Sequence, residues 1–257
     1  MKIGIIGIGK MGEAILRSLV KSFSAEDIFI HDTHTEKAEK LSQELEVKNC
    51  ALNDAFQDSD TLILAIKPQD FDTLNIQAEN RIIISIMAGV NIKKIMNKLK
   101  TNKVIRVMSN LCCLVKESAS AFASSEDVTD QEKEFVKNLL LKFGSAIEVK
   151  EKLMDAVTGL SGSGTAYVAH FIDSLTEAGK KQGLSDEQAK DLSIQTVLGV
   201  GKLMKENHLS AEELISMCSS KGGTTEQGIK VFKNSDFKKI VAEAVEKATE
   251  KSKELGK

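Results

Sequence analysis

The sequence predicts an α/β protein in which a doubly wound parallel sheet is followed by an all-α second domain. Three observations support this prediction. Apolar strand segments alternate with helical patterns up to about residue 150, a glycine-rich turn joins the first strand to the first helix, and long helical periodicities without clear strands follow Glu151. Alternating strands and helices are typical of βαβ units, whose parallel sheet is covered on both faces. We therefore place one domain at residues 1–150 and a helical one at residues 151–257.

Five strands are predicted in the first domain. Each is a short run rich in Ile, Val or Leu, the composition of a strand that is buried on both faces of a sheet. The runs are Lys2–Ile6, Ile28–His31, Thr61–Ile66, Arg81–Ile86 and Lys103–Met108. Ligands bind such sheets outside the carboxyl ends of the strands, so the residues that follow these runs are candidates for a site.

The turn Gly7-Ile8-Gly9-Lys10-Met11-Gly12 lies between the first strand and an apolar helical pattern. At this spacing one glycine makes the tight turn, one lets the backbone approach a pyrophosphate, and one lets helix and strand pack closely. N–H groups at the helix start then face the phosphates. Asp32 ends the second strand about 20 residues past the last glycine, where a ribose-binding carboxylate is expected. The pattern predicts a dinucleotide site; the alternative is an ordinary glycine-rich βα turn.

Two further strand ends are predicted to share this crevice. They are Ala65-Ile66-Lys67-Pro68 after the third strand and Met87-Ala88-Gly89 after the fourth. Pro68 is the one proline among 257 residues, where average usage gives about a dozen.

The second domain is predicted to be helical throughout. The helical periodicities cover Lys152–Val157, Ala166–Gly183, Asp186–Lys205, Ala211–Ser216 and Asp236–Leu255. Ser185 with Gln188, and Ser210 with Glu213, have the spacing of capping boxes that begin helices. Glycine-rich breaks at Ser161-Gly162-Ser163-Gly164-Thr165 and at residues 219–225 present N–H groups and hydroxyls at helix starts. Such breaks suit a small carboxylate, or they are capped interhelical turns.

Composition limits the classes of partner. The net charge is −2 with both signs interspersed, which predicts neither nucleic-acid nor membrane binding. No apolar stretch reaches the roughly 20 residues that cross a bilayer, and the start lacks a charged leader. The four cysteines show no metal-ligand spacing, so we expect reduced thiols and no protein-bound metal. The chain is expected to be cytoplasmic.

These motifs together resemble the pyrroline-5-carboxylate reductase family from end to end. The matching segments are the glycine turn, Ala65–Gln69, Val104–Met108, Asp155–Gly164, Gln195–Gly199 and Gly222–Thr225. The Asp155–Gly164 and Gly222–Thr225 segments are specific to this family rather than to dinucleotide binding in general. The resemblance implies a Rossmann-type first domain, NAD(P)H-dependent reduction of the imino acid 1-pyrroline-5-carboxylate to L-proline, and a homodimer of interleaved helices, often five dimers in a decamer.

The resemblance also implies roles for individual residues. Thr225 matches a threonine that hydrogen-bonds the substrate nitrogen, and we expect it to be catalytic. N–H groups of Gly223, Thr224 and Thr225 would hold the substrate carboxylate. Glu151 is similar to a glutamate near the substrate, with a solvated helix-start acid as the alternative. The further expected contacts are Ser161 and Gly162 with substrate, and Ala65, Lys67, Pro68, Ala88 and Gly89 with the nicotinamide side of the cofactor.

The choice between NADH and NADPH rests on the loop after the second strand. Asp32 would accept hydrogen bonds from a ribose diol and repel a 2′-phosphate, which favours NADH. If Asp32 turned away, Thr33, His34, Thr35 and Lys37 could instead bind the phosphate of NADPH.

The sequence departs from the family around the expected site. The family usually has Pro-Asn-Thr-Pro where this chain has Ser109-Asn110-Leu111-Cys112, glycines near Lys116 and Ser118, and prolines at Thr165 and Lys221. Avoidance of proline along the whole chain explains the lost prolines but not the lost glycines. A reductase of a related cyclic imine or of a β-hydroxyacid, and a non-catalytic dinucleotide-binding regulatory protein, therefore stay open as alternatives.

Overall fold

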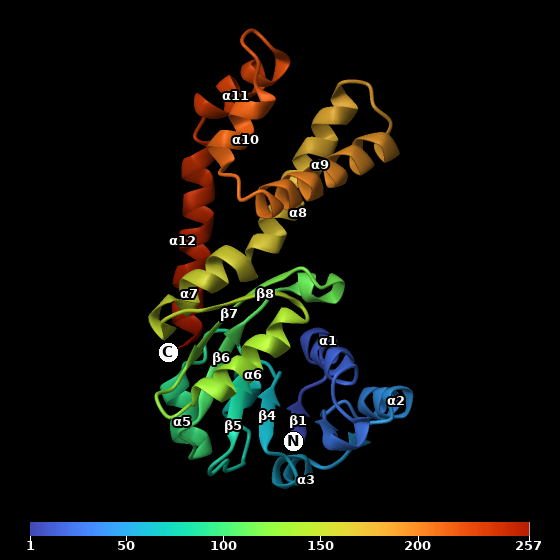
Figure 1. Cartoon of the computed structure of the whole chain (residues 1–257), viewed down its shortest axis with the longest axis vertical. Helices are drawn as coiled ribbons and strands as arrows, with labels where there is room; N and C mark the ends of the chain where they lie inside the picture. Colours follow the sequence, from blue (N-terminus) through green and yellow to red (C-terminus); the bar gives the residue numbers. More distant parts are fainter. Residues whose placement is uncertain (257) are drawn as a thin grey trace. The chain divides into compact units, whose positions relative to one another are not determined.

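A computed structural model describes residues 1–256 of the chain, whose first part contains one eight-stranded sheet (Figure 1). The strand order is β3-β2-β1-β4-β5-β6-β7-β8, and every neighbouring pair is parallel except β6 and β7. The strands are β1 (Ile3–Ile6), β2 (Ile28–His31), β3 (Lys48–Asn49), β4 (Thr61–Leu64), β5 (Ile82–Ser85), β6 (Val104–Met108), β7 (Ser118–Ser124) and β8 (Gly144–Glu148). The predicted fold class and all five predicted strands are confirmed.

Helices cover both faces of the sheet, as a doubly wound fold requires. On one face, apolar side chains of α1 (Lys10–Leu19), α2 (Thr35–Leu45) and α6 (Asp130–Leu141) form a buried core with the strands. On the other face, α4 (Pro68–Phe71), α5 (Ile92–Leu99) and α7 (Met154–Val157) do so. The remaining short elements are η1 (Ala25–Asp27), α3 (Leu52–Gln57), η2 (Leu111–Val115), η3 (Glu151–Leu153) and η4 (Thr158–Gly162).

Three strands, β3, β7 and β8, were not predicted, and the sequences of β7 and β3 explain why. β7 has the sequence Ser-Ala-Ser-Ala-Phe-Ala-Ser, in which one aromatic residue is the only strong strand former. Its small side chains pair antiparallel with β6 and parallel with β8. β3 has two residues, too few to show an alternating pattern. Strand pairing, rather than local sequence preference, therefore determines the edge of the sheet formed by β7 and β8.

Contacts between residues divide the chain into two compact units. Unit 1 contains Met1–Ser163 together with the chain from Glu246 onward, and unit 2 contains Gly164–Val245. The domain boundary at residue 150 rests on helical periodicity and stays a prediction, since the helical segment from Glu151 to Ser163 belongs to unit 1 by its contacts.

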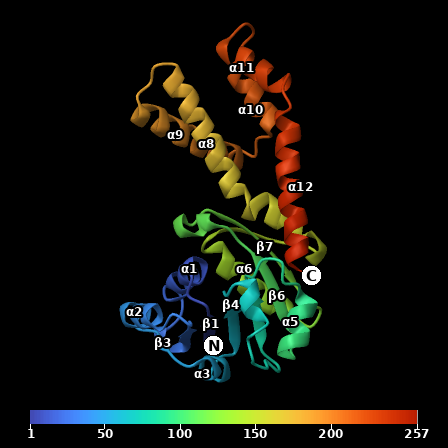
Figure 2. The ribbon, with the colours of Figure 1, turned by 180° about the vertical axis from the view of Figure 1, so that it is seen from behind.

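Unit 2 is helical, as predicted. Its elements are α8 (Gly164–Lys181), α9 (Asp186–Glu206), α10 (Ala211–Cys218), α11 (Thr224–Lys233) and the first part of α12 (Phe237–Leu255) (Figure 2). Ser185 and Ser210 each accept the predicted N–H hydrogen bond, so both capping boxes are confirmed. Across the described residues 1–256, none of the helices combines the length and the apolar character needed to span a bilayer.

Candidate active site

The carboxyl ends of the central strands bring the predicted dinucleotide motif together. The N–H of Gly7 donates to the carbonyl of His31 at the end of β2 (2.8 Å), and the N–H of Ala65 donates to the carbonyl of Ile6 (2.8 Å). The N–H of Ile86 in turn donates to Leu64 (3.1 Å). These bonds continue the parallel ladders past the strands, so the glycine turn lies against the residues that follow β2 and β4.

The three glycines of the turn meet three different demands. Gly7 has φ +95°, and a Cβ there would lie 2.7 Å from the carbonyl oxygen of Ala65. A Cβ on Gly12 would overlap the carbonyl oxygen of Gly7, so α1 packs on the turn only without a side chain at this position. Around Gly9, by contrast, a Cβ would meet nothing within 4 Å. The backbone at Gly9 is therefore open to an approaching ligand at the start of α1, which fits a pyrophosphate.

Asp32 lies beside this turn with both carboxylate oxygens engaged. Its Oδ2 accepts the N–H of Ile8 (2.5 Å) and its Oδ1 accepts the N–H of His34 (2.8 Å). Each oxygen retains a further lone pair for a ribose hydroxyl. The half-buried Lys37 reaches back to the carbonyl of Ile8 (2.5 Å) and pairs with Glu13 (3.0 Å). The ammonium group of Lys37 is thus neutralised by an acid on α1.

The two other predicted strand ends differ in accessibility. Lys67 is exposed and precedes Pro68, the first residue of α4, where a missing N–H costs nothing. Ala88 is half-buried. Gly89 has φ +77°, and a Cβ on it would lie 2.9 Å from Cβ of Leu255 at the end of α12. Within unit 1, the last turn of α12 therefore covers Gly89, while Ala88 and Lys67 stay accessible.

Glu151 belongs to a charge cluster that the sequence did not reveal. Its Oε1 accepts the N–H of Ile92 at the start of α5 (2.5 Å) and lies 3.8 Å from the guanidinium of Arg106. The Arg106 side chain is 4% exposed, and its Nη2 lies 3.5 Å from Asp155, which also accepts the hydroxyl of Ser252 (2.7 Å). A buried charge needs partners. Arg106 lies within a predicted central strand, and this was the sequence feature from which the charge cluster could have been predicted. Glu151 caps α5 and partly neutralises Arg106.

The altered segment after β6 forms a hydrogen-bonded loop with Ser161. The side-chain amide of Asn110 donates to the carbonyl (3.2 Å) and hydroxyl (3.3 Å) of Ser161, and that hydroxyl donates to the carbonyl of Ala119 (2.7 Å). Gly162 follows at the end of η4. The Ser161 hydroxyl proton is thus used within unit 1.

The second glycine-rich break begins α11 in unit 2. Gly223 is its N-cap residue without a side-chain cap, and its own N–H donates to Ser220 (2.9 Å). Thr224 and Thr225 are exposed, and in the described part of the chain no protein group accepts their N–H or hydroxyl hydrogens. These are the unpaired donors that a helix start leaves for an anion. Glu226 accepts the N–H of Gly222 (2.8 Å) and pairs with Lys230 (3.6 Å).

Comparisons with known proteins agree along the whole chain. The model for pyrroline-5-carboxylate reductase dimerisation matches residues 151–255, and the model for NADP oxidoreductase, coenzyme F420-dependent, matches residues 2–89. The pyrroline-5-carboxylate reductase of Aquifex aeolicus is 38% identical, covering 99% of this chain and 97% of that protein. The enzyme of that name from Synechocystis is 36% identical, covering 100% and 99%.

Solved structures agree as well. A pyrroline-5-carboxylate reductase from Coxiella burnetii superposes with a TM-score of 0.93 at 27% identity, covering 100% of this chain and 98% of that one. The Plasmodium falciparum pyrroline carboxylate reductase, solved with NADP bound, has a TM-score of 0.85 at 30% identity over the same shares.

Proposed function

The chain belongs to the pyrroline-5-carboxylate reductase family, and we propose from that premise how its own residues reduce 1-pyrroline-5-carboxylate to L-proline. The family assignment rests on relatives that are 36–38% identical over 97–99% of their own length. It makes the chain an NAD(P)H-dependent oxidoreductase that acts on a C=N bond. The observation that carries the proposal for this chain is the glycine turn, in which Gly7 and Gly12 are closed by packing while Gly9 is open.

We place the cofactor phosphates over Gly9, Lys10 and Met11 at the start of α1. The open space at Gly9 and the helix N-terminus support this placement. Asp32 would accept hydrogen bonds from the adenosine ribose, next to Thr33, and its negative charge would repel a 2′-phosphate. The pairing of Lys37 with Glu13 removes one cation that a 2′-phosphate could use. We therefore propose a preference for NADH over NADPH.

On the nicotinamide side we propose Ala65, Lys67, Pro68, Ala88 and Gly89. The cofactor supplies the hydride, and the protein must orient the ring and exclude water. Ala88 and Pro68 offer half-buried apolar surface at two strand ends. The end of α12 covers Gly89. We therefore expect Gly89 to keep this strand end in place and not to contact the nicotinamide ring.

We place the substrate carboxylate on the N–H groups of Thr224 and Thr225, beside Gly223, whose own N–H already donates to the carbonyl of Ser220, and we place the ring nitrogen on the Thr225 hydroxyl. A protonated imine is already electrophilic, so the C=N carbon accepts hydride and the nitrogen keeps its proton, with no strong base required. The unpaired donors at the start of α11 support this placement. Glu151, Ser161 and Gly162 would act on the substrate through the elements that they hold, because the Glu151 carboxylate and Ser161 hydroxyl already have partners.

We also propose that the protein works as a homodimer through unit 2. Large apolar side chains on its helices are exposed, among them Leu192, Leu198, Val231 and Ile240, with exposed fractions of 57–71%. Exposed apolar surface of this extent marks an interface, and the dimerisation model covers these positions. Five such dimers in a decamer, and a cytoplasmic location in keeping with four free cysteines, complete the proposal.

The test is the absorbance of reduced nicotinamide when the purified protein is mixed with 1-pyrroline-5-carboxylate and NADH or NADPH. We expect rapid oxidation, faster with NADH at low cofactor concentration. Binding of both cofactors without oxidation would contradict the proposed reaction and favour a non-catalytic dinucleotide-binding protein. Oxidation with another cyclic imine only would instead assign a related substrate.

A further inference from the structure

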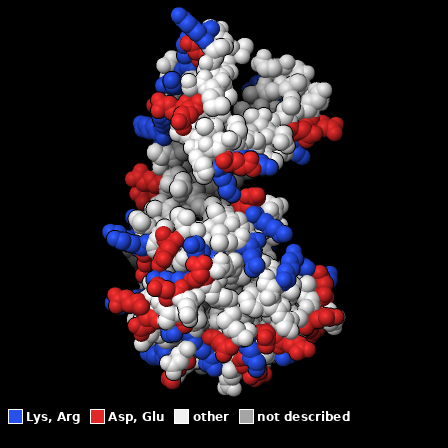
Figure 3. Space-filling view, viewed as in Figure 1, with Lys and Arg blue, Asp and Glu red and all other residues white. Residues whose placement is uncertain are grey.

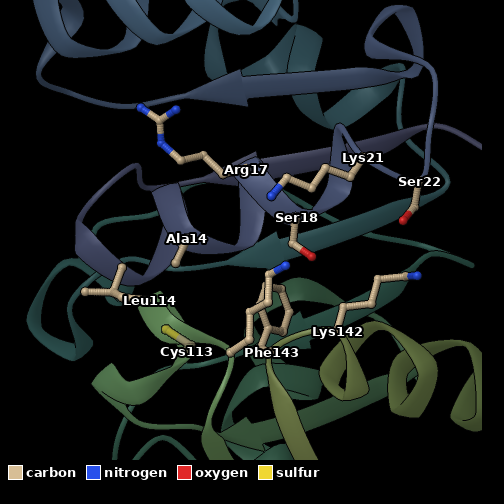
Figure 4. A pocket seen from close by; sticks show the side chains of 10 residues that line it. Ala14, Arg17, Ser18, Lys21, Ser22, Cys113, Leu114, Lys142 and Phe143 are labelled. Carbon is tan, nitrogen blue, oxygen red and sulfur yellow. The ribbon is translucent and has the colours of Figure 1, made fainter.

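A basic cavity lies on unit 1, and the glycines of the dinucleotide turn do not belong to its lining. Its volume is about 480 Å³, within the range of small-molecule sites. Figure 4 shows side chains from α1 and the residues after it on one side, and from η2 and the residues between α6 and β8 on the other. The lining residues are Ala14, Arg17, Ser18, Lys21, Ser22, Cys113, Leu114, Lys116, Lys142 and Phe143. Within the described residues 1–256, no Asp or Glu side chain belongs to this lining.

The charges around the cavity are unevenly compensated. Arg17 forms ion pairs with Glu13 (3.0 Å) and Glu44 (2.7 Å), and its hydrogen bond to Glu44 is the main cause of its raised pKa. Lys21, Lys116 and Lys142 have no ion pair or side-chain hydrogen bond to any residue within 1–256. Figure 3 shows Lys and Arg atoms on this face, over α1. Three ammonium groups around one cavity repel one another, and a bound anion would relieve that repulsion.

The other lining groups favour a particular chemistry. The hydroxyls of Ser18 and Ser22 can donate to anionic oxygens, and lysine is a common point-charge partner of phosphate. Burial raises the pKa of the Cys113 thiol, so no thiolate forms there near neutral pH to oppose an anion. Ala14, Leu114 and the buried Phe143 add an apolar wall.

We propose that this cavity binds a small molecule that carries a polyphosphate group. Several negative charges match three unpaired lysines, which a single carboxylate would leave mostly uncompensated. The cavity is also linked to the cofactor turn, because Sγ of Cys113 lies 3.4 Å from Sδ of Met11. An anion that holds η2 against α1 thus acts on residues next to the proposed phosphate position.

The test measures binding of inorganic tripolyphosphate to the full chain by titration calorimetry in saturating NADH, so that the dinucleotide turn is occupied. We expect one site per chain, and affinity at least tenfold weaker when Lys21→Ala and Lys142→Ala are combined. Lys116→Gly should also weaken binding while keeping the fold, because Lys116 has φ +63°, which glycine adopts without strain. Citrate, a polycarboxylate of similar charge, should bind more weakly than tripolyphosphate.

Two control variants distinguish binding in this cavity from a general effect of positive charge and from binding at the dinucleotide turn. Lys238→Ala with Lys239→Ala removes the same number of charges from exposed positions in α12 and should leave tripolyphosphate affinity within twofold. Gly9→Ala should weaken NADH binding and leave tripolyphosphate binding intact. Absence of tripolyphosphate binding, its loss in Gly9→Ala, unchanged affinity without Lys21 and Lys142, or equal binding of citrate would each overturn the proposal.

Discussion

The hydroxyl oxygens of Ser109 and Ser118 lie 2.6 Å apart, and both lie within 3.1 Å of the Ser120 hydroxyl. The family that this chain belongs to usually has proline near the first position and glycine near the second, and neither of those residues could form this bond. The Ser118 hydroxyl also accepts the N–H of Asn110 (3.2 Å). The two departures therefore support each other and keep the loop after β6 in a defined conformation, which is what a working site requires and which disfavours the non-catalytic alternative.

We expect these serines to be energetically coupled. Ser118 is 2% exposed, so Ser118→Ala should lower the free energy of unfolding by about 1–2 kcal/mol through unpaired buried groups. Ser109→Ala should cost about 1 kcal/mol, and the double variant less than the sum. Urea unfolding of all three variants measures this, with the exposed Ser174→Ala as control. Strictly additive losses would show that the hydroxyls do not act as a unit.

The limits of sequence-based prediction are visible in this loop. The central strands and the glycine turn follow from Ile-rich runs and spacing, because those features are local. The bonds of Ser118, by contrast, depend on β7 pairing with β6 and β8, and a segment of alternating Ser and Ala gives no such signal. The partners of Glu151 were hidden for the same reason, since Arg106 and Ile92 meet it across 45 and 59 residues of chain.

Asp32→Asn should change cofactor preference while keeping the hydrogen bond to the glycine turn. The variant keeps an oxygen that can accept the N–H of Ile8, but its amide nitrogen cannot accept the N–H of His34, and it loses the charge that would repel a 2′-phosphate. We expect the ratio of kcat/KM for NADH over NADPH to fall about tenfold, equivalent to about 1.4 kcal/mol. Steady-state kinetics with both cofactors measure the ratio. An unchanged ratio would mean that Asp32 stabilises the glycine turn and does not determine the cofactor preference.

Glu132 should make stability depend on pH in the acidic range. Burial acts to raise the pKa of this carboxyl, but hydrogen bonds from Lys103 (2.6 Å) and from the backbone of Thr129 (2.8 Å) outweigh it and lower the pKa. A depressed folded-state pKa stabilises the protein above the unfolded value of about 4.3, and this stabilisation is lost as pH falls through the folded value. Glu132→Gln should therefore cost about 1 kcal/mol at pH 7.

Urea unfolding at several pH values tests this prediction. The difference between the parent chain and Glu132→Gln should shrink steadily below about pH 4.3. Glu134→Gln is the matched control, because it removes an acid from the same helix. The contact of Glu134 with Lys137 is long (3.9 Å) and exposed. A difference for Glu132→Gln that stays constant down to about pH 3, more than a unit below the unfolded value, would contradict a role for its charge.

A charge on the apolar surface of unit 2 should break the proposed dimer. Leu198 in α9 is 57% exposed, and Leu198→Glu would force a carboxylate into an interface at a cost of several kcal/mol. We expect a monomer by sedimentation, and loss of activity if the substrate site needs a partner subunit. Lys190→Gln changes the net charge equally on the same helix and should stay dimeric. A Leu198→Glu chain that remains a dimer would place the interface elsewhere.

Thr225 allows the most direct test of the proposed chemistry. It lies in the first turn of α11 but is not its cap, which is Gly223, so Thr225→Ala should change stability little. Loss of the hydroxyl that orients the imine nitrogen should lower kcat about 10- to 100-fold, with NADH affinity unchanged because the proposed cofactor contacts lie in unit 1. Thr225→Ser restores the hydroxyl and should recover most of the rate.

Thr224→Ala is the neighbouring control, because only the backbone N–H of Thr224 is assigned to the substrate carboxylate. Equal losses of kcat in both alanine variants, or no recovery of kcat with serine, would contradict this role. Thr225 would then contribute only its backbone N–H, and another group would bind the imine nitrogen.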